Sequence, residues 1–165
     1  MRTDMAIKFH RNPTQEEFCH MAKFIRPADV MEIWQACGLT PTHAIAMLEK
    51  ASDVVFVALH GKQPVYLFGG LKGAPLAACG QCWGFATTWC DKHPLTLAKV
   101  SKTGFRMIFD ELPVPRLSCR ILADGEATKT WIKWLGAKLD EKTEPGVNGG
   151  NFQRYVIERE ACYGC

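Results

Sequence analysis

The sequence predicts an α/β (α+β) domain in which a mixed central β-sheet is flanked by helices. Two observations carry this prediction: apolar residues recur at helical spacing in some segments, and β-branched or aromatic runs fill others. The segments follow one another in the order β-α-α-α-β-β-β-α-β-α-β-β. This order requires antiparallel pairing within hairpins and parallel pairing where a helix connects two strands.

The first third of the chain contains signals for one strand and three helices. Thr14 and Glu17 have capping-box spacing, so a helix should begin there. Pro27 and Pro41 stand where the first turn of a helix tolerates proline, and Gly38 suits a helix end. We therefore expect a strand over 6–9 and helices over 14–24, 27–37 and from 41 to about 51.

From residue 53 the apolar period changes. The run VVFVAL at 54–59 is continuous, as in a strand buried on both faces, and a turn at 60–63 returns the chain as a hairpin. The segment 71–77 is rich in glycine and proline and predicts a loop. The remaining expected strands are 64–70, 81–90, 117–122, 138–141 and 152–158, and the remaining helices are 94–112 and 127–135.

Large aromatic residues alternate along the expected strand 81–90. Trp83, Phe85 and Trp89 would then face one side of the sheet, because side chains alternate along a strand. On that side they either line a groove or form core against a helix.

Composition restricts the class of protein. The chain has 165 residues, 20 Lys+Arg against 17 Asp+Glu and a formal net charge of +3. This suits a single domain, with a core over about 5–158 and a C-terminal tail over 159–165 that should fray. The small charge surplus argues against a specific nucleic-acid partner. No apolar run reaches the ~20 residues of a membrane span, and the N-terminus lacks the pattern of a secretory signal, so we expect a protein that is not secreted.

Eight cysteines are present. In a chain of this length without a secretory signal, reduced thiols are expected rather than a disulfide framework. Two C-x-x-C pairs leave a four-cysteine zinc site open as an alternative, although the pairs are far apart in the sequence. The ligands would be Cys79, Cys82, Cys162 and Cys165.

Four segments carry a resemblance to a known family: IRPADVMEIWQACGLTPTHAI, EKASDVVFVALHGKQPVYLFGG, DKHPLTLAKVSK and ILADGEATKTWIKWLGAKLDE. In this order they resemble GNAT-like proteins, with the acyltransferase fold, of tailed phages and prophages, related to the internal virion or morphogenesis proteins of short-tailed podophages. The resemblance covers residues 7–157, and W-I-K-W-L-G-A and D-K-H-P are its most specific parts.

The resemblance implies an acetyl-CoA site after the fourth strand, where enzymes of this fold present a glycine-rich loop at a helix N-terminus. The corresponding stretch 91–98 has no glycine, begins with Asp91 and contains a proline. Any cofactor contacts here would come from side chains. The candidates are Trp89, Lys92, His93 and Thr96.

The resemblance also implies an acid that protonates the leaving thiolate, often a tyrosine on the helix after the fifth strand, and a glutamate or an ordered water as base. The expected helix 127–135 has Trp131 and Trp134 but no tyrosine, and tryptophan has no accessible proton to give. The candidates are Tyr155 on the last strand as the acid and Glu126 at the helix start as the base.

Two functions follow from the resemblance. The first is a phage protein with degenerate acetyl-CoA chemistry and no cofactor. It would act in virion assembly, internal virion structure and DNA ejection through contacts with phage or host proteins, in the host cytoplasm or inside the virion. The alternative is an acetyl-CoA-dependent N-acetyltransferase that modifies a protein or a small amine.

Overall fold

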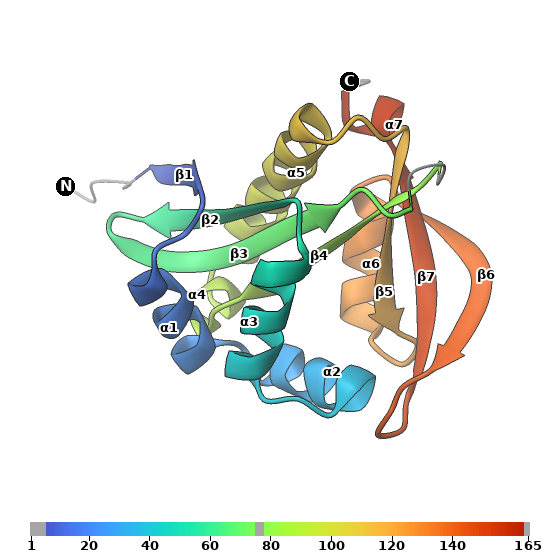
Figure 1. The fold of residues 1–165 in the computed structure, drawn as a ribbon, viewed down its shortest axis with the longest axis horizontal. Helices are drawn as coiled ribbons and strands as arrows, with labels where there is room; N and C mark the ends of the chain where they lie inside the picture. Colours follow the sequence, from blue (N-terminus) through green and yellow to red (C-terminus); the bar gives the residue numbers. More distant parts are fainter. Residues whose placement is uncertain (1–5, 75–77, 164–165) are drawn as a thin grey trace.

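The computed structural model describes residues 6–74 and 78–163. In this part of the chain seven strands form one mixed sheet in the order β1-β2-β3-β4-β5-β7-β6 (Figure 1). The strands are β1 Ile7–Arg11, β2 Val54–His60, β3 Gln63–Leu71, β4 Gly80–Ala86, β5 Arg116–Leu122, β6 Lys138–Pro145 and β7 Asn151–Glu158.

The sheet is antiparallel except at one place. Strands β1 to β4 pair antiparallel in chain order, and β7 pairs antiparallel with both β5 and β6. Only β4 and β5 are parallel, and they are connected by the long helix α5, Pro94–Glu111. A helical crossover is what a parallel pair requires, so the predicted fold class and element order are confirmed.

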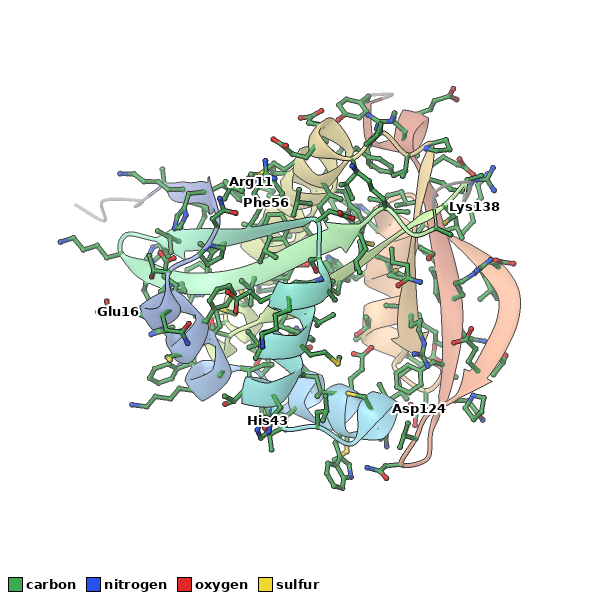
Figure 2. The ribbon with its side chains drawn as sticks, in the orientation of Figure 1. Arg11, Glu16, His43, Phe56, Asp124 and Lys138 are labelled. Carbon is green, nitrogen blue, oxygen red and sulfur yellow. The ribbon has the colours of Figure 1, made fainter. Side chains whose placement is uncertain are left out.

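Helices cover both faces of this sheet. Alternate residues of β2 define the faces: Val55 and Val57 pack with α1 (Gln15–Phe24) and α3 (Pro41–Ala51), whereas Phe56 belongs to the core cluster that contains residues of α5 and α6 (Glu126–Trp134). Helix α2, Pro27–Cys37, lies beside α3 on the first face (Figure 1). Phe56 is inside the body, while Arg11, Glu16, His43 and Lys138 are exposed at its periphery (Figure 2).

The predicted helix starts are present. The Thr14 side chain accepts the Glu17 backbone N–H, and the Glu17 carboxylate accepts the Thr14 N–H at 2.7 Å, which completes the capping box. Prolines occupy the first turns of α2, α3 and α5. Gly38 has φ 69° and ends α2, a left-handed conformation that glycine adopts without steric cost.

The expected strand 81–90 is wrong in its second half. Strand β4 ends at Ala86, and Thr88–Asp91 form the short helix α4. The reason is tertiary: α2 occupies both backbone groups of Ala86, since its carbonyl accepts the Arg26 N–H at 2.9 Å and its N–H donates to Asp29 at 2.8 Å. Trp89 therefore does not share a face with Trp83 and Phe85.

The C-terminal part is more ordered than expected. Strand β6 runs to Pro145 rather than to 141, because it pairs with β7 on both sides of a register shift between Asp140 and Thr143. Residues 159–163, expected to fray, form helix α7, Arg159–Tyr163. The Arg159 side chain holds it by donating to the carbonyls of Leu112 and Val114.

Candidate active site

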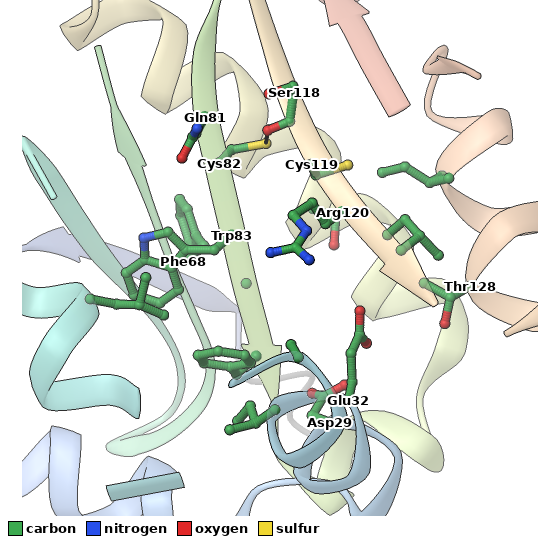
Figure 3. A pocket seen from close by; sticks show the side chains of 18 of the residues that line it. Asp29, Glu32, Phe68, Gln81, Cys82, Trp83, Ser118, Cys119, Arg120 and Thr128 are labelled. Atoms are coloured by element: carbon green, nitrogen blue, oxygen red, sulfur yellow. Dashed lines mark hydrogen bonds between the residues drawn. The ribbon is translucent and has the colours of Figure 1, made fainter. Parts of the chain in front are cut away.

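The parallel strands β4 and β5 separate almost as soon as they meet. Their ladder has two residue pairs, Gly80 with Leu117 and Gln81 with Ser118. Beyond these pairs the strands diverge and open a cleft of about 490 Å³ that reaches both faces of the sheet. Figure 3 shows the gap, with Cys82 and Trp83 on one wall and Cys119 and Arg120 on the other.

The edge of β4 that faces the cleft presents free backbone groups. The Thr87 N–H donates to the Val65 carbonyl on β3 at 3.0 Å, so odd-numbered residues of this stretch pair with β3. Strand alternation then directs the N–H and C=O of Gly84 into the gap. A Cβ at Gly84 would lie 2.3 Å from the Tyr66 hydroxyl, so only glycine fits here without displacing Tyr66.

Helices α5 and α6 form the cleft wall on one face of the sheet. Leu97 and Ser101 of α5 and Thr128 and Trp131 of α6 are among the lining residues. The indole N–H of Trp131 is buried and has no hydrogen-bond partner within the described residues. An unsatisfied buried donor is costly, and in a cleft it is a group that a ligand can satisfy.

A buried ion pair shapes the opposite side. The Arg26 guanidinium donates to the Asp29 carboxylate at 2.8 Å, and Asp29 also accepts the Ala86 N–H. Burial raises the pKa of Asp29 above its ordinary value, although Arg26 opposes the shift. The pair joins α2 to β4 at the point where the strand ends, and so fixes the position of α2 against the cleft.

Glu32 extends from α2 into the cleft one turn after Asp29 (Figure 3). Burial raises its pKa to about 7, and the negative charge of Asp29 acts in the same direction. It forms no ion pair with any residue in the described ranges. A carboxylate with a pKa near 7 in a cleft can take up a proton at neutral pH, which is the requirement for a general base.

The candidate cofactor contacts Lys92, His93 and Thr96 lie at the start of α5, with Trp89 one turn before it. The His93 ring stacks on the Trp89 indole with centroids 3.9 Å apart, and its Nδ1 is 2.8 Å from the Trp89 carbonyl oxygen. Trp89 also stacks on His60, at 4.8 Å. The structure therefore brings two of the four candidates, Trp89 and His93, into contact, but none of the four lines the cleft itself.

Comparisons with known proteins show which solved structures share this architecture. No family model matches the chain, and no curated protein matches its sequence. Spermidine N-acetyltransferase from Vibrio cholerae, solved with CoA and spermine, superposes with a TM-score of 0.75 at 9% identity over 96% of this chain and 98% of that one. The aminoglycoside acetyltransferase AAC(6')-Ib, solved with ribostamycin and CoA, gives 0.70 at 10% identity over 96% and 97%. This chain has the GNAT acetyltransferase fold.

Two sets of groups suit acetyl-CoA, one at the start of α5, whose residue Leu97 lines the cleft, and one in the cleft itself. The first turn of α5 leaves the N–H groups of Leu95 and Thr96 without intrahelical acceptors, beside Lys92. The Gly84 backbone faces the gap, and Trp131 is among the residues that line the cleft. Pro94 offers no N–H, so this first turn has one donor fewer than a glycine-rich loop would have.

The two catalytic candidates from the sequence do not lie in the cleft. Tyr155 is 1% exposed in the core, in register with Cys119 on β5, and is not among the lining residues. The Glu126 side chain is 79% exposed and pairs with Lys129 at 2.5 Å. A proton donor or acceptor must reach the reacting group, and Glu32 is better placed for that.

The cysteine hypothesis is tested only in part. Cys165 lies outside the described residues, so the four-cysteine zinc site stays an alternative. Among the described residues no group of three or more His, Cys, Asp or Glu is arranged to hold a metal ion. Cys82 and Cys119 are neighbours at the vertex of the cleft, the narrow end where β4 and β5 begin to separate. The hydrogen bond with Cys119 is the main cause that raises the pKa of the Cys82 thiol, and burial is the second.

Sequence reasoning missed Glu32 and Gly84. Glu32 lies on the helix 27–37 that was predicted correctly, but the helical pattern does not say which polar residue of α2 faces a gap between strands far along the chain. Gly84 interrupts the aromatic run QCWGFA. An isolated glycine in a strand marks close approach of other atoms, and this feature could have identified the position.

Within the part of the chain that the structure covers, no helix is both long enough and apolar enough for a membrane crossing.

Proposed function

We propose that this protein is an N-acetyltransferase that uses acetyl-CoA, with Glu32 as the general base. The observation that carries the proposal is the position of Glu32, a carboxylate with a pKa of about 7 inside the gap between β4 and β5. The fold adds support, because structures that share it include two acetyltransferases solved with CoA. These neighbours are too distant in sequence to give more than the fold.

Residues at the start of α5 and residues that line the cleft would have different roles. The start of α5, with Lys92 and the N–H groups of Leu95 and Thr96, would hold the pyrophosphate. The Gly84 N–H and the Trp131 indole N–H would orient the arm that carries the acetyl group. Acetyl-CoA supplies the activated acetyl group. Glu32 would take the proton that an ammonium must lose before its nitrogen can react.

The test uses the purified chain with acetyl-CoA and a mixture of primary amines, with the acetylated product measured by mass spectrometry. A thiol reagent is unsuitable because the chain itself has eight cysteines. Acetyl-CoA should raise the melting temperature, since a ligand that binds only the native state stabilises it. Glu32→Gln should keep this thermal shift and lose about 10²-fold or more in turnover.

Glu49→Gln is the matched control, because Glu49 is exposed on α3 and does not line the cleft. It should retain both the thermal shift and the turnover. No shift at millimolar acetyl-CoA, or equal turnover by Glu32→Gln and the unaltered chain, would overturn the proposal.

A second candidate is a role in a phage virion, exercised through protein contacts without acetyl transfer. The observation that favours it is the start of α5, which has no glycine and has Pro94 in its first turn. The same experiment separates the two candidates, because an assembly protein with a degenerate site would show no thermal shift with acetyl-CoA.

A further inference from the structure

The cleft has a chamber on the α2 and α3 side of the sheet, opposite α5 and α6. Trp83 and Phe85 of β4 point to this side, because they pack with Leu67 in the cluster beneath α1 and α3. Glu32 lines the same cleft from α2, and Figure 3 draws its carboxylate between Asp29 and Thr128, on the β5 side of β4. We call this space the acceptor chamber, and its lining used below is Glu32, Ile33, Met47, Leu48, Trp83 and Phe85.

The charges around the acceptor chamber nearly cancel. Three arginines line the cleft, and each has its own carboxylate: Arg26 pairs with Asp29, Arg120 pairs with Glu144 at 3.2 Å, and Arg154 donates to Asp140 at 2.7 Å. Arg120 also lies over the Phe152 ring. Glu32 is the cleft carboxylate without an arginine or lysine partner in the described ranges. The chamber can therefore compensate a single positive charge.

The other residues named for the chamber are apolar, and Trp83 is held by a hydrogen bond. The Trp83 and Phe85 rings lie 5.5 Å apart at an angle of 37°, and the Trp83 indole N–H is fixed by the Ser52 hydroxyl at 2.8 Å. Ile33, Met47 and Leu48 complete the wall. A fixed aromatic corner favours a flat apolar group, because rings gain from edge-on or offset contact beyond the burial of area.

We propose that the acceptor is a primary amine with one positive charge on an apolar, ring-bearing body. Its ammonium would meet Glu32, and its ring would pack against Trp83 and Phe85. A second ammonium on the same molecule would enter the chamber without a carboxylate partner, and a carboxylate beside the amine would face Glu32 while the nearby arginines are already paired. This inference rests on the proposed function of the same cleft.

The proton and atom balance is complete with the groups named. The ammonium gives one proton to the Glu32 carboxylate. The amine nitrogen then bonds to the carbonyl carbon of the thioester, and the carbon–sulfur bond breaks with its electron pair passing to sulfur. The nitrogen loses a second proton, which the sulfur gains, so the products are an amide and a thiol. Glu32 returns its proton to water.

The experiment compares four amines at saturating acetyl-CoA: 2-phenylethylamine, n-butylamine, spermidine and L-phenylalanine. The expected kcat/KM is highest for 2-phenylethylamine, about tenfold or more above each of the others, because the ring and the single charge are both used. Phe85→Leu should raise KM for 2-phenylethylamine about tenfold and leave n-butylamine little changed. Phe24→Leu, an exposed ring on α1, is the matched control and should change neither.

Different results of this experiment would contradict the proposed acceptor and the proposed acetyltransferase function. Acetylation of spermidine or L-phenylalanine at least as well as 2-phenylethylamine would overturn the inference and leave the acetyltransferase proposal standing. An equal effect of Phe85→Leu on both monoamines would do the same. Acetyl-CoA binding without acetylation of any of the four amines would also overturn it, whereas no binding of acetyl-CoA would overturn the proposed function itself.

Discussion

The Asp29 carboxylate on α2 accepts the backbone N–H of Ala86 on β4 at 2.8 Å. Through this bond a helix near the N-terminus terminates the strand that forms one wall of the cleft. The same carboxylate neutralises Arg26, so one buried side chain fixes both the end of β4 and the position of the helix that carries Glu32.

Removing the charge of Asp29 should weaken the fold substantially. Asp29→Asn leaves the Arg26 guanidinium, whose side chain is 22% exposed, without its principal partner. Breaking a buried pair in this way lowers the free energy of unfolding by about 3 kcal/mol. Urea denaturation measures it. Asp91→Asn is the control, because Asp91 is half-exposed and 3.7 Å from Arg26, and it should cost less than about 1 kcal/mol. Equal losses in the two variants would contradict the assignment.

The Glu32 carboxyl should make stability depend on pH. Its pKa is about 7 in the folded chain and 4.5 as the ordinary value, so between these values the folded state holds a proton that the unfolded state has lost. The native state is therefore favoured at low pH, and this contribution disappears as the pH rises through 7. Glu32→Gln should gain stability over the unaltered chain between pH 5 and pH 8, by at most about 3 kcal/mol. A constant difference in unfolding free energy across that range would exclude the raised pKa.

The contact of Gly84 with Tyr66 should appear in a double-mutant cycle. Gly84→Ala places a Cβ 2.3 Å from the Tyr66 hydroxyl, and overpacking of this kind costs about 1–3 kcal/mol. In a Tyr66→Phe background the nearest atom is gone, so the same substitution should cost less. Thermal or urea unfolding of the four proteins gives the interaction energy. If the cost of Gly84→Ala is the same in both backgrounds, the two residues are not coupled.

Cysteine reactivity should follow burial. The hydrogen bond with Cys119 and burial raise the pKa of the Cys82 thiol, and burial raises the pKa of Cys90 to about 11. Both should resist iodoacetamide at neutral pH, because the thiolate is the reactive form, whereas the exposed Cys19 should be alkylated first. Peptide mapping by mass spectrometry measures the order in which the cysteines are alkylated. Labelling of Cys82 as fast as Cys19 would show that the vertex of the cleft is open to solvent.

Local chemistry accounts for most of the correct predictions about the fold. The capping box of Thr14 and Glu17 and the prolines that begin α2, α3 and α5 act within one helical turn, so the sequence alone contains them. The apolar run at 54–59 is equally local, and it specified a strand buried on both faces. The expected strand over 81–90 failed where a distant residue decides the conformation, since Asp29 and the Arg26 backbone end β4 at Ala86.

The features of the candidate site likewise fall into those set by neighbouring residues and those set by distant ones. Residues adjacent in the chain specify most of the order of strands and helices, the glycine-free Pro94 turn at the start of α5 and the lack of a tyrosine on α6, so these features could be predicted from the sequence. Folding, by contrast, places Tyr155 in the core, leaves Glu126 exposed to solvent and brings Glu32 into the gap between β4 and β5. The raised pKa of Glu32 comes from burial among segments far apart in the sequence, and burial exists only once the chain is folded.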